Sequence, residues 1–179
     1  MKRDRGGRAQ ERFDALELAE TGGIITGEVD PAELSRLGDR LAPADDGSRA
    51  RIAWRIAGGH DALGRPMLVL SLEGAVFLVC QRCLKSFAVR VEQETMLLLA
   101  RDEAELAVLD DAELEVILAK LPVDPVTLVE DELLLSLPFS PRHGEQQCAG
   151  ASALRPEAGA GQSPFAGLAQ LKARRESKQ

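Results

Sequence analysis

Residues 67–100, MLVLSLEGAVFLVCQRCLKSFAVRVEQETMLLLA, decide the fold that this sequence predicts. The first half is rich in aliphatic and β-branched residues, and residues 87–92 alternate apolar and polar side chains, which is the period of a half-buried strand. Between the halves stands the Cys-x-x-Cys motif of Cys80 and Cys83. Two strands joined there would place both sulfur atoms at one tight turn, which is half of a tetrahedral zinc site.

The flanking segments predict further strands and helices around this central hairpin. Residues 51–56 alternate with period two, and Gly-rich loops between strands favour antiparallel pairing. Asp30-Pro31 and Asp124-Pro125 each place a capping residue before a proline, and apolar residues on one helical face follow both. The sequence therefore predicts an α+β fold. We expect an antiparallel sheet or partly closed barrel with a central Cys-x-x-Cys hairpin and one or two packed helices.

Composition divides the chain into three parts. Residues 13–143 carry most of the periodic apolar pattern, so we predict a single α+β domain there. Residues 144–163 are mostly Gly, Ala, Gln and Ser with little to bury, which predicts a flexible linker. Residues 164–179 begin with apolar residues spaced i, i+3, i+6 and end in basic residues. We predict a short docking helix and a basic tail in that last part.

The net charge of −7 is unevenly distributed. Residues 1–12 and 171–179 are basic, whereas residues 101–132 hold eleven acidic and two basic side chains. An acidic body cannot collect phosphates through counterion release as a basic groove does, so we expect RNA contact to be weak or indirect. The acidic body suits a basic partner instead, and ribosomal proteins are one such class.

The sequence also limits where the protein functions. No apolar run approaches the ~20 residues of a membrane span, and residues 1–5 lead into polar chain rather than a signal-peptide core. Three cysteines, two of them in Cys-x-x-Cys, favour a reducing compartment. We therefore expect a cytoplasmic protein without membrane contact.

Zinc requires four ligands, and the chain offers few beyond the Cys-x-x-Cys pair. Cys80, Cys83, His143 and Cys148 would complete a site if the chain after residue 138 folds back onto the hairpin. A metal-free turn with two reduced thiols is the alternative. A redox dithiol is a third interpretation, but thioredoxin-like motifs lie at a helix N-terminus and this motif precedes a strand-like segment.

Glu130, Asp131 and Glu132 are consecutive on the predicted helix that begins at Pro125. Consecutive helical positions diverge by about 100°, so the three carboxylates do not converge on one ion. We expect a solvated or partner-facing acidic surface. The sequence has no Gly-rich phosphate loop, no Ser-His-Asp arrangement and no dinucleotide fingerprint, so we expect a protein that is not an enzyme.

Several segments in combination resemble the bacterial YceD family, the large ribosomal RNA subunit accumulation proteins. They are the Cys-Gln-Arg-Cys hairpin at residues 80–83, LVEDELLLSLP at residues 128–138, Pro-Arg-His at residues 141–143 and PFAGLAQLK at residues 164–172. In order and spacing the resemblance extends from about residue 13 to residue 172. No single motif is diagnostic, but the combination is specific.

The resemblance implies a non-enzymatic factor for accumulation of 23S ribosomal RNA, in the setting of large-subunit assembly. We therefore hypothesise a ribosome-biogenesis factor that binds a basic ribosomal protein or a pre-rRNA particle. A thiol-dependent redox protein and a zinc-knuckle nucleic-acid-binding module remain the alternatives. The residues that the resemblance and the acidic charge assign to partner binding are Arg82, Glu130, Asp131, Glu132 and His143.

Overall fold

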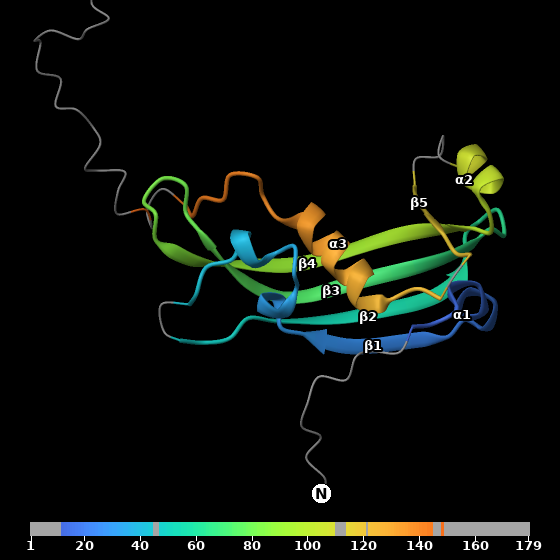
Figure 1. Cartoon of the computed structure of the whole chain (residues 1–179), viewed down its shortest axis with the longest axis horizontal. Helices are drawn as coiled ribbons and strands as arrows, with labels where there is room; N and C mark the ends of the chain where they lie inside the picture. The colour runs from blue at the N-terminus through green and yellow to red at the C-terminus, as the bar shows by residue number, and fades with distance from the viewer. Residues whose placement is uncertain (1–11, 45–46, 110–113, 121, 145–147, 149–179) are drawn as a thin grey trace, which may run out of the picture. The chain divides into compact units, whose positions relative to one another are not determined.

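One mixed β-sheet organises the protein (Figure 1). The computed structural model describes residues 12–44, 47–109, 114–120, 122–144 and 148. Within them the strand order is β1-β2-β3-β4-β5, with β1 to β4 antiparallel and β5 parallel to β4. The strands are β1 (Ile24–Val29), β2 (Arg51–His60), β3 (Pro66–Val79), β4 (Ser86–Ala100) and β5 (Glu115–Leu118).

The α+β class is confirmed, but the sheet is neither wholly antiparallel nor closed into a barrel over the described residues. After β4 the chain forms α2 (Glu103–Leu109) and then lays β5 alongside β4 in the same direction. A parallel pair needs a crossover connection, and α2 lies in that connection. The sheet therefore ends in two separate edge strands, β1 and β5.

The three α-helices of the described residues begin after capping aspartates, Asp14, Asp102 and Asp124. The carboxylate of Asp14 accepts hydrogen bonds from the first turn of α1 (Ala15–Thr21), and Asp124 accepts one from the backbone N–H of Val126 at 2.9 Å. Pro125 then occupies the first turn of α3 (Pro125–Ser136), where its missing N–H costs nothing. The helix predicted from Asp124-Pro125 is thus present, and it crosses one face of the sheet (Figure 1).

The segment after Asp30 is not the predicted helix. It forms two short 3₁₀ turns, η1 (Pro31–Glu33) and η2 (Gly38–Arg40). Asp30 does cap the first turn, but Leu34 then adopts an extended backbone, with φ −83° and ψ 120°. That break lets Leu34 and Leu37 both enter the core, and the backbone N–H of Arg36 bonds to a side chain of α3 instead of a helical carbonyl.

The hydrophobic core lies between α3 and one face of the sheet. Val129 and Leu133 of α3 are completely buried there. Alternate side chains of β2 and β3 face them, which is the pattern expected of a half-buried sheet. These strand residues are Ile52, Trp54, Ile56, Leu68, Leu70 and Leu72.

The predicted domain boundaries are not tested by these observations. The linker predicted at residues 144–163 lies outside the described residues, apart from Gly144 and Cys148. The docking helix and basic tail predicted at residues 164–179, and the basic residues 1–11, also lie outside them.

Candidate metal centre

A six-residue turn, residues 80–85, connects β3 to β4 and carries both cysteines of the motif. The backbone N–H of Cys80 donates to the carbonyl of Lys85 at 2.9 Å, and the N–H of Leu84 donates to the carbonyl of Cys80 at 2.9 Å. Leu84 has a φ of 60°, in the left-handed region that favours glycine. The turn buries Cys80 and half-buries Cys83.

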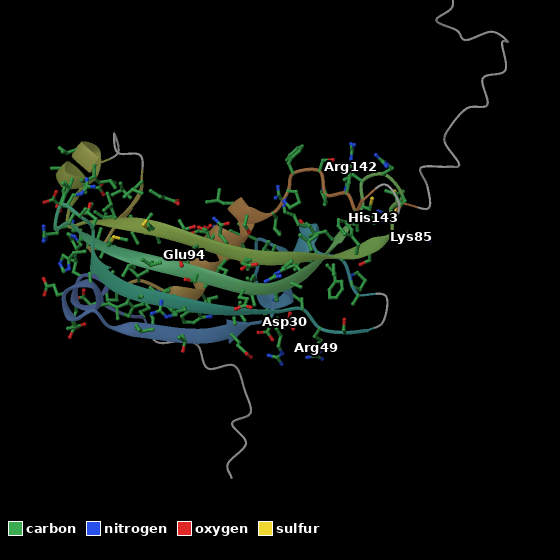
Figure 2. The ribbon with its side chains drawn as sticks, turned by 180° about the vertical axis from the view of Figure 1, so that it is seen from behind. Asp30, Arg49, Lys85, Glu94, Arg142 and His143 are labelled. Carbon is green, nitrogen blue, oxygen red and sulfur yellow. The ribbon has the colours of Figure 1, made fainter. Side chains whose placement is uncertain are left out.

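The chain after α3 brings His143 to this turn. Pro138 is not compatible with a continuing helix, so the chain leaves α3 and runs toward the turn. There the backbone N–H of Gln81 donates to the carbonyl of Pro141 at 2.9 Å. The Nε2 atom of His143 lies 3.1 Å from the Sγ atom of Cys83, and the imidazole packs edge-on against Phe87. Figure 2 shows His143 at the same end of the molecule as Lys85.

The four residues predicted to bind zinc lie close together. Cys80, Cys83, His143 and Cys148 each offer one ligand atom, and these atoms all lie within 4.8 Å of one another. Ligands of tetrahedral zinc are about 3.3–3.8 Å apart, given bond lengths of about 2.0–2.3 Å, so little adjustment is needed. Three thiols and one imidazole are also a common donor set of structural zinc sites. The residues therefore fit a metal ion, although zinc itself stays a prediction.

The surroundings of Cys80 favour a thiolate. Burial by itself raises the pKa of the Cys80 thiol. Backbone N–H groups of Cys83, Arg82 and His143, together with the Cys83 side chain, donate to the sulfur and outweigh that effect, lowering the pKa to about 6. The thiolate is the form that binds metal. The other ring nitrogen of His143, Nδ1, is buried and has no hydrogen-bond partner among the described residues.

The acidic stretch of α3 differs from the expected exposed surface. Glu130 and Glu132 are only 8% and 6% exposed, and the side chain of Asp131 is 48% exposed. The carboxylate of Glu130 accepts the backbone N–H of Arg36 at 2.7 Å and its Nε–H at 3.0 Å, while Nη1 of Arg36 donates to Asp131 at 2.5 Å. These bonds attach the segment between η1 and η2 to α3. Of the three, only Asp131 is substantially open to a partner, and its binding role stays a prediction.

The other predicted partner-binding residues lie at the turn. Arg82 is half-buried in the connector between β3 and β4. His143 belongs to the candidate metal site through its contact with Cys83. The structure therefore places Arg82 and His143 at the turn between β3 and β4, whereas Glu130 and Asp131 lie on α3 and bind Arg36.

Comparison with known proteins identifies the family. A match to the family described as large ribosomal RNA subunit accumulation protein YceD covers residues 68–172, more than half of the chain. The chain belongs to the YceD family. No curated protein and no solved structure matches it. The matched residues contain the four candidate metal ligands and α3, and the family description supports a role in ribosome biogenesis.

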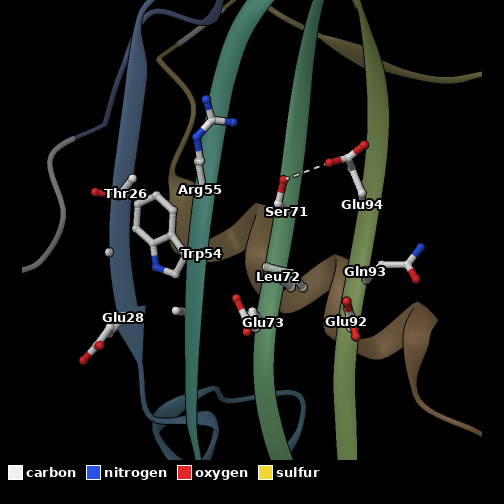
Figure 3. A pocket seen from close by; sticks show the side chains of 12 residues that line it. Thr26, Glu28, Trp54, Arg55, Ser71, Leu72, Glu73, Glu92, Gln93 and Glu94 are labelled. Carbon is white, nitrogen blue, oxygen red and sulfur yellow. Dashed lines mark hydrogen bonds between the residues drawn. The ribbon is translucent and has the colours of Figure 1, made fainter.

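The sheet has a hollow on the face opposite α3, which the sequence did not predict (Figure 3). It has a volume of about 1020 Å³, and four carboxylates and one guanidinium, that of Arg55, line it. Register places Glu73 of β3 directly opposite Glu92 of β4, and the neighbouring row pairs Ser71 with Glu94. The four carboxylates, named the acidic hollow below, belong to Glu28, Glu73, Glu92 and Glu94.

Two of these carboxylates have cationic partners at the rim and two do not. Arg51 lies 3.6 Å from Glu28, and Arg90 lies 2.7 Å from Glu92. Among the described residues Glu73 forms no ion pair, and Glu94 only accepts a long hydrogen bond from Ser71 at 3.5 Å. Alternation along β3 and β4 could have placed these side chains on one face, but only the strand register puts two of them opposite each other.

None of the described helices has the length and apolar character of a membrane span.

Proposed function

We propose that this protein is a non-enzymatic ribosome-biogenesis factor that supports accumulation of 23S ribosomal RNA by holding a basic large-subunit ribosomal protein in the acidic hollow. The family supports the ribosomal setting. The observation that supports a basic partner is the pairing of Glu73 with Glu92, because like charges directly opposite in a sheet are destabilising. A lysine or arginine of a partner placed between them would remove that repulsion, which makes the hollow complementary to a basic protein.

The hollow supports this role better than the acidic stretch of α3 does. Glu73, Glu92 and Glu94 are exposed, whereas Glu130 and Glu132 are buried against the protein's own core. A partner can reach the first group without rearrangement of the fold. Binding to Glu130 would first have to displace its two hydrogen bonds from Arg36.

The test is a charge-neutral triple variant, Glu73→Gln with Glu92→Gln and Glu94→Gln. A matched control removes the same number of charges from exposed carboxylates outside the hollow, through Glu20→Gln, Glu33→Gln and Glu103→Gln. Each protein is tested for binding to purified large-subunit ribosomal proteins one at a time. The ratio of 23S to 16S ribosomal RNA is measured in cells that carry the variant as their only copy.

We expect one of the ribosomal proteins to bind, and the hollow variant to weaken that binding by about tenfold or more, because close charge pairs contribute strongly to such interfaces. The 23S to 16S ratio should fall with it, and the control should resemble the wild type. Absence of binding to every ribosomal protein, or equal weakening by both triple variants, would contradict the proposal. The substitutions remove the Glu73–Glu92 repulsion and the exposed Arg90–Glu92 ion pair, so the variant should be folded with a stability close to that of the wild type.

Zinc bound by Cys80, Cys83, His143 and Cys148 forms the second part of this proposal. Its role is structural: it would fix the turn between β3 and β4 to the chain that follows α3. Elemental analysis of protein purified without tags or chelators should give near one zinc per chain, with Cys80 and Cys83 unreactive toward thiol reagents. Metal-free protein with three titratable thiols would overturn this part and leave the acidic hollow unaffected.

The lowered pKa of Cys80 also suits a redox dithiol, which is the competing function. The position of the motif argues against it, because the two cysteines lie between two strands rather than at a helix N-terminus. Insulin reduction separates the two. Turnover that depends on Cys80 and Cys83 would favour the redox function, whereas a zinc-bound turn should show none.

A further inference from the structure

An exposed surface surrounds the candidate metal site at the turn between β3 and β4. The turn at residues 80–85 and the chain that follows α3 are joined there by the Gln81–Pro141 hydrogen bond and the Cys83–His143 contact. A hollow of about 300 Å³ beside them is lined by residues of η2, the turn and the chain after α3. We name this surface the knuckle end and define it by Arg40, Leu84, Lys85, Phe139 and Arg142.

The knuckle end carries three exposed cations. Arg40, Lys85 and Arg142 are exposed, and none of them forms an ion pair with the part of the chain that the structure describes. Five other arginines of the described residues form ion pairs with carboxylates. These paired residues are Arg36, Arg51, Arg65, Arg90 and Arg101. Asp39 is the single carboxylate that lines the hollow of the knuckle end. This end is therefore a local cationic surface on a chain whose net charge is −7.

Large apolar side chains lie among these cations and face the solvent. Phe139 is 93% exposed, the highest value among the large exposed hydrophobic residues of the described chain, and Leu84 is 75% exposed. Phe139 follows Pro138 and lines the same hollow as Arg40 and Gln81. An open aromatic ring beside unpaired cations is the combination that binds single-stranded nucleic acid, because the ring stacks on a base and the cations contact phosphates.

We propose that the knuckle end binds a short single-stranded segment of RNA, with Phe139 stacking on a base and Arg40, Lys85 and Arg142 contacting phosphates. This deepens the proposed function, since it rests on the same ribosomal role and adds an RNA contact to the protein contact at the acidic hollow. The acidic body excludes RNA elsewhere, so the footprint covers only a few nucleotides. The knuckle end contacts RNA while the acidic hollow contacts a basic protein.

The charge count makes the proposal quantitative. For single strands, the logarithm of the binding constant falls with the logarithm of the salt concentration by about 0.7 for each phosphate neutralised. Three cations therefore give a slope of about −2. Stacking contributes little to that slope, because it involves no counterion release. Salt dependence thus separates the contribution of the three cations from that of Phe139.

The experiment measures fluorescence anisotropy of a labelled single-stranded RNA of about 12 nucleotides and mixed sequence. The full-length, metal-loaded protein is titrated at salt concentrations from about 50 to about 200 mM. One variant combines Arg40→Gln, Lys85→Gln and Arg142→Gln, and a second carries Phe139→Ala. A matched control removes three exposed cations outside both the knuckle end and the acidic hollow, through Arg12→Gln, Arg49→Gln and Lys120→Gln.

We expect the wild type to bind with a slope of about −2, and the knuckle triple variant to lose most of that slope and about tenfold or more in affinity. Phe139→Ala should weaken binding about tenfold and leave the slope unchanged, since stacking on one base is removed. The control should resemble the wild type. A duplex of the same length should bind more weakly than the single strand, because its base faces are not accessible to Phe139.

Three results would overturn the proposal: no RNA binding by the wild type, equal losses in the knuckle variant and the control, or selective binding of a poly-glutamate peptide in place of RNA. The last would make an acidic protein the occupant of this surface. The Glu73→Gln, Glu92→Gln, Glu94→Gln variant keeps the two proposals separate. It should lose the ribosomal protein but keep RNA binding, so either surface can fail without the other.

Discussion

Replacing Glu130 by alanine tests whether the acidic stretch of α3 is structural. The carboxylate of Glu130 accepts two hydrogen bonds from Arg36, one from the backbone N–H at 2.7 Å and one from Nε–H at 3.0 Å. The segment that carries Arg36 also places Leu34 and Leu37 in the core. Loss of the carboxylate therefore weakens the attachment of η1 and η2 to α3 as well as the bonds themselves.

The magnitude follows from the bonds removed. Hydrogen bonds to a charged group contribute about 1.5–3 kcal/mol each. The exposed guanidinium of Arg36 can bond to water when the carboxylate is removed, so we take the lower end of that range for its bond. We expect Glu130→Ala to lower the free energy of unfolding by about 2–4 kcal/mol, and Glu130→Gln by about half as much, because the amide oxygen still accepts the backbone N–H. Asp131→Ala, at a half-exposed side chain, should cost less than about 1 kcal/mol.

Urea unfolding followed by tryptophan fluorescence measures these differences. Trp54 is the single tryptophan and is 4% exposed, so its emission reports on the core. With an m-value of about 2 kcal/mol/M, Glu130→Ala should shift the midpoint by about 1–2 M urea. An unchanged midpoint, or equal shifts for Glu130→Ala and Asp131→Ala, would refute the structural role. If it holds, any loss of ribosomal RNA caused by Glu130 variants reports on folding rather than on partner binding.

Three further predictions follow from local geometry. Gly58→Ala should lower the free energy of unfolding by about 3 kcal/mol in the same urea assay, because the added Cβ would lie 2.0 Å from the carbonyl oxygen of Leu18 in α1. Gly59→Ala is the control and should have little effect, because no atom lies within 4 Å of the position of its Cβ. Leu84→Gly should raise the free energy of unfolding by about 1 kcal/mol, since it removes a left-handed leucine whose side chain is exposed, and a measured loss would contradict this. Burial raises the pKa of Asp61, but hydrogen bonds from Arg65 and Leu63 outweigh it and hold that pKa below its ordinary value. A depressed carboxylate pKa contributes stability above about pH 4 that is lost as the pH falls through the folded value. The stability deficit of Asp61→Asn should therefore be constant near neutrality and shrink in acid, and a deficit that does not shrink as the pH falls below about 4 would contradict this.

The candidate metal centre was predictable in its residues but not in its geometry. Cys80 and Cys83 form a recognisable pair in the sequence, and His143 and Cys148 were the remaining donors near a helix stop. Their approach within 4.8 Å depends on where the chain runs after α3, which no local pattern specifies. The knuckle end was hidden for the same reason, because Arg40, Lys85 and Arg142 are far apart in the sequence.

The sequence by itself determined the local elements and the family. Alternating residues predicted β2 and part of β4, an aliphatic and β-branched run predicted β3, and Asp124-Pro125 predicted the start of α3. Strand period and helix caps depend on residues only a few positions apart, so the sequence shows them directly. The motifs along residues 68–172 identified the YceD family in the same way.

Only the tertiary structure decided how distant residues meet. The parallel placement of β5, the Arg36–Glu130 contact across 94 positions and the Glu73–Glu92 register all arise from packing of the whole chain. Glu130 looked like a surface residue in the sequence, yet it is buried because a segment broken at Leu34 brings Arg36 to it. A local pattern sets the face that a side chain occupies, whereas its partner is set by contacts between segments far apart in the chain.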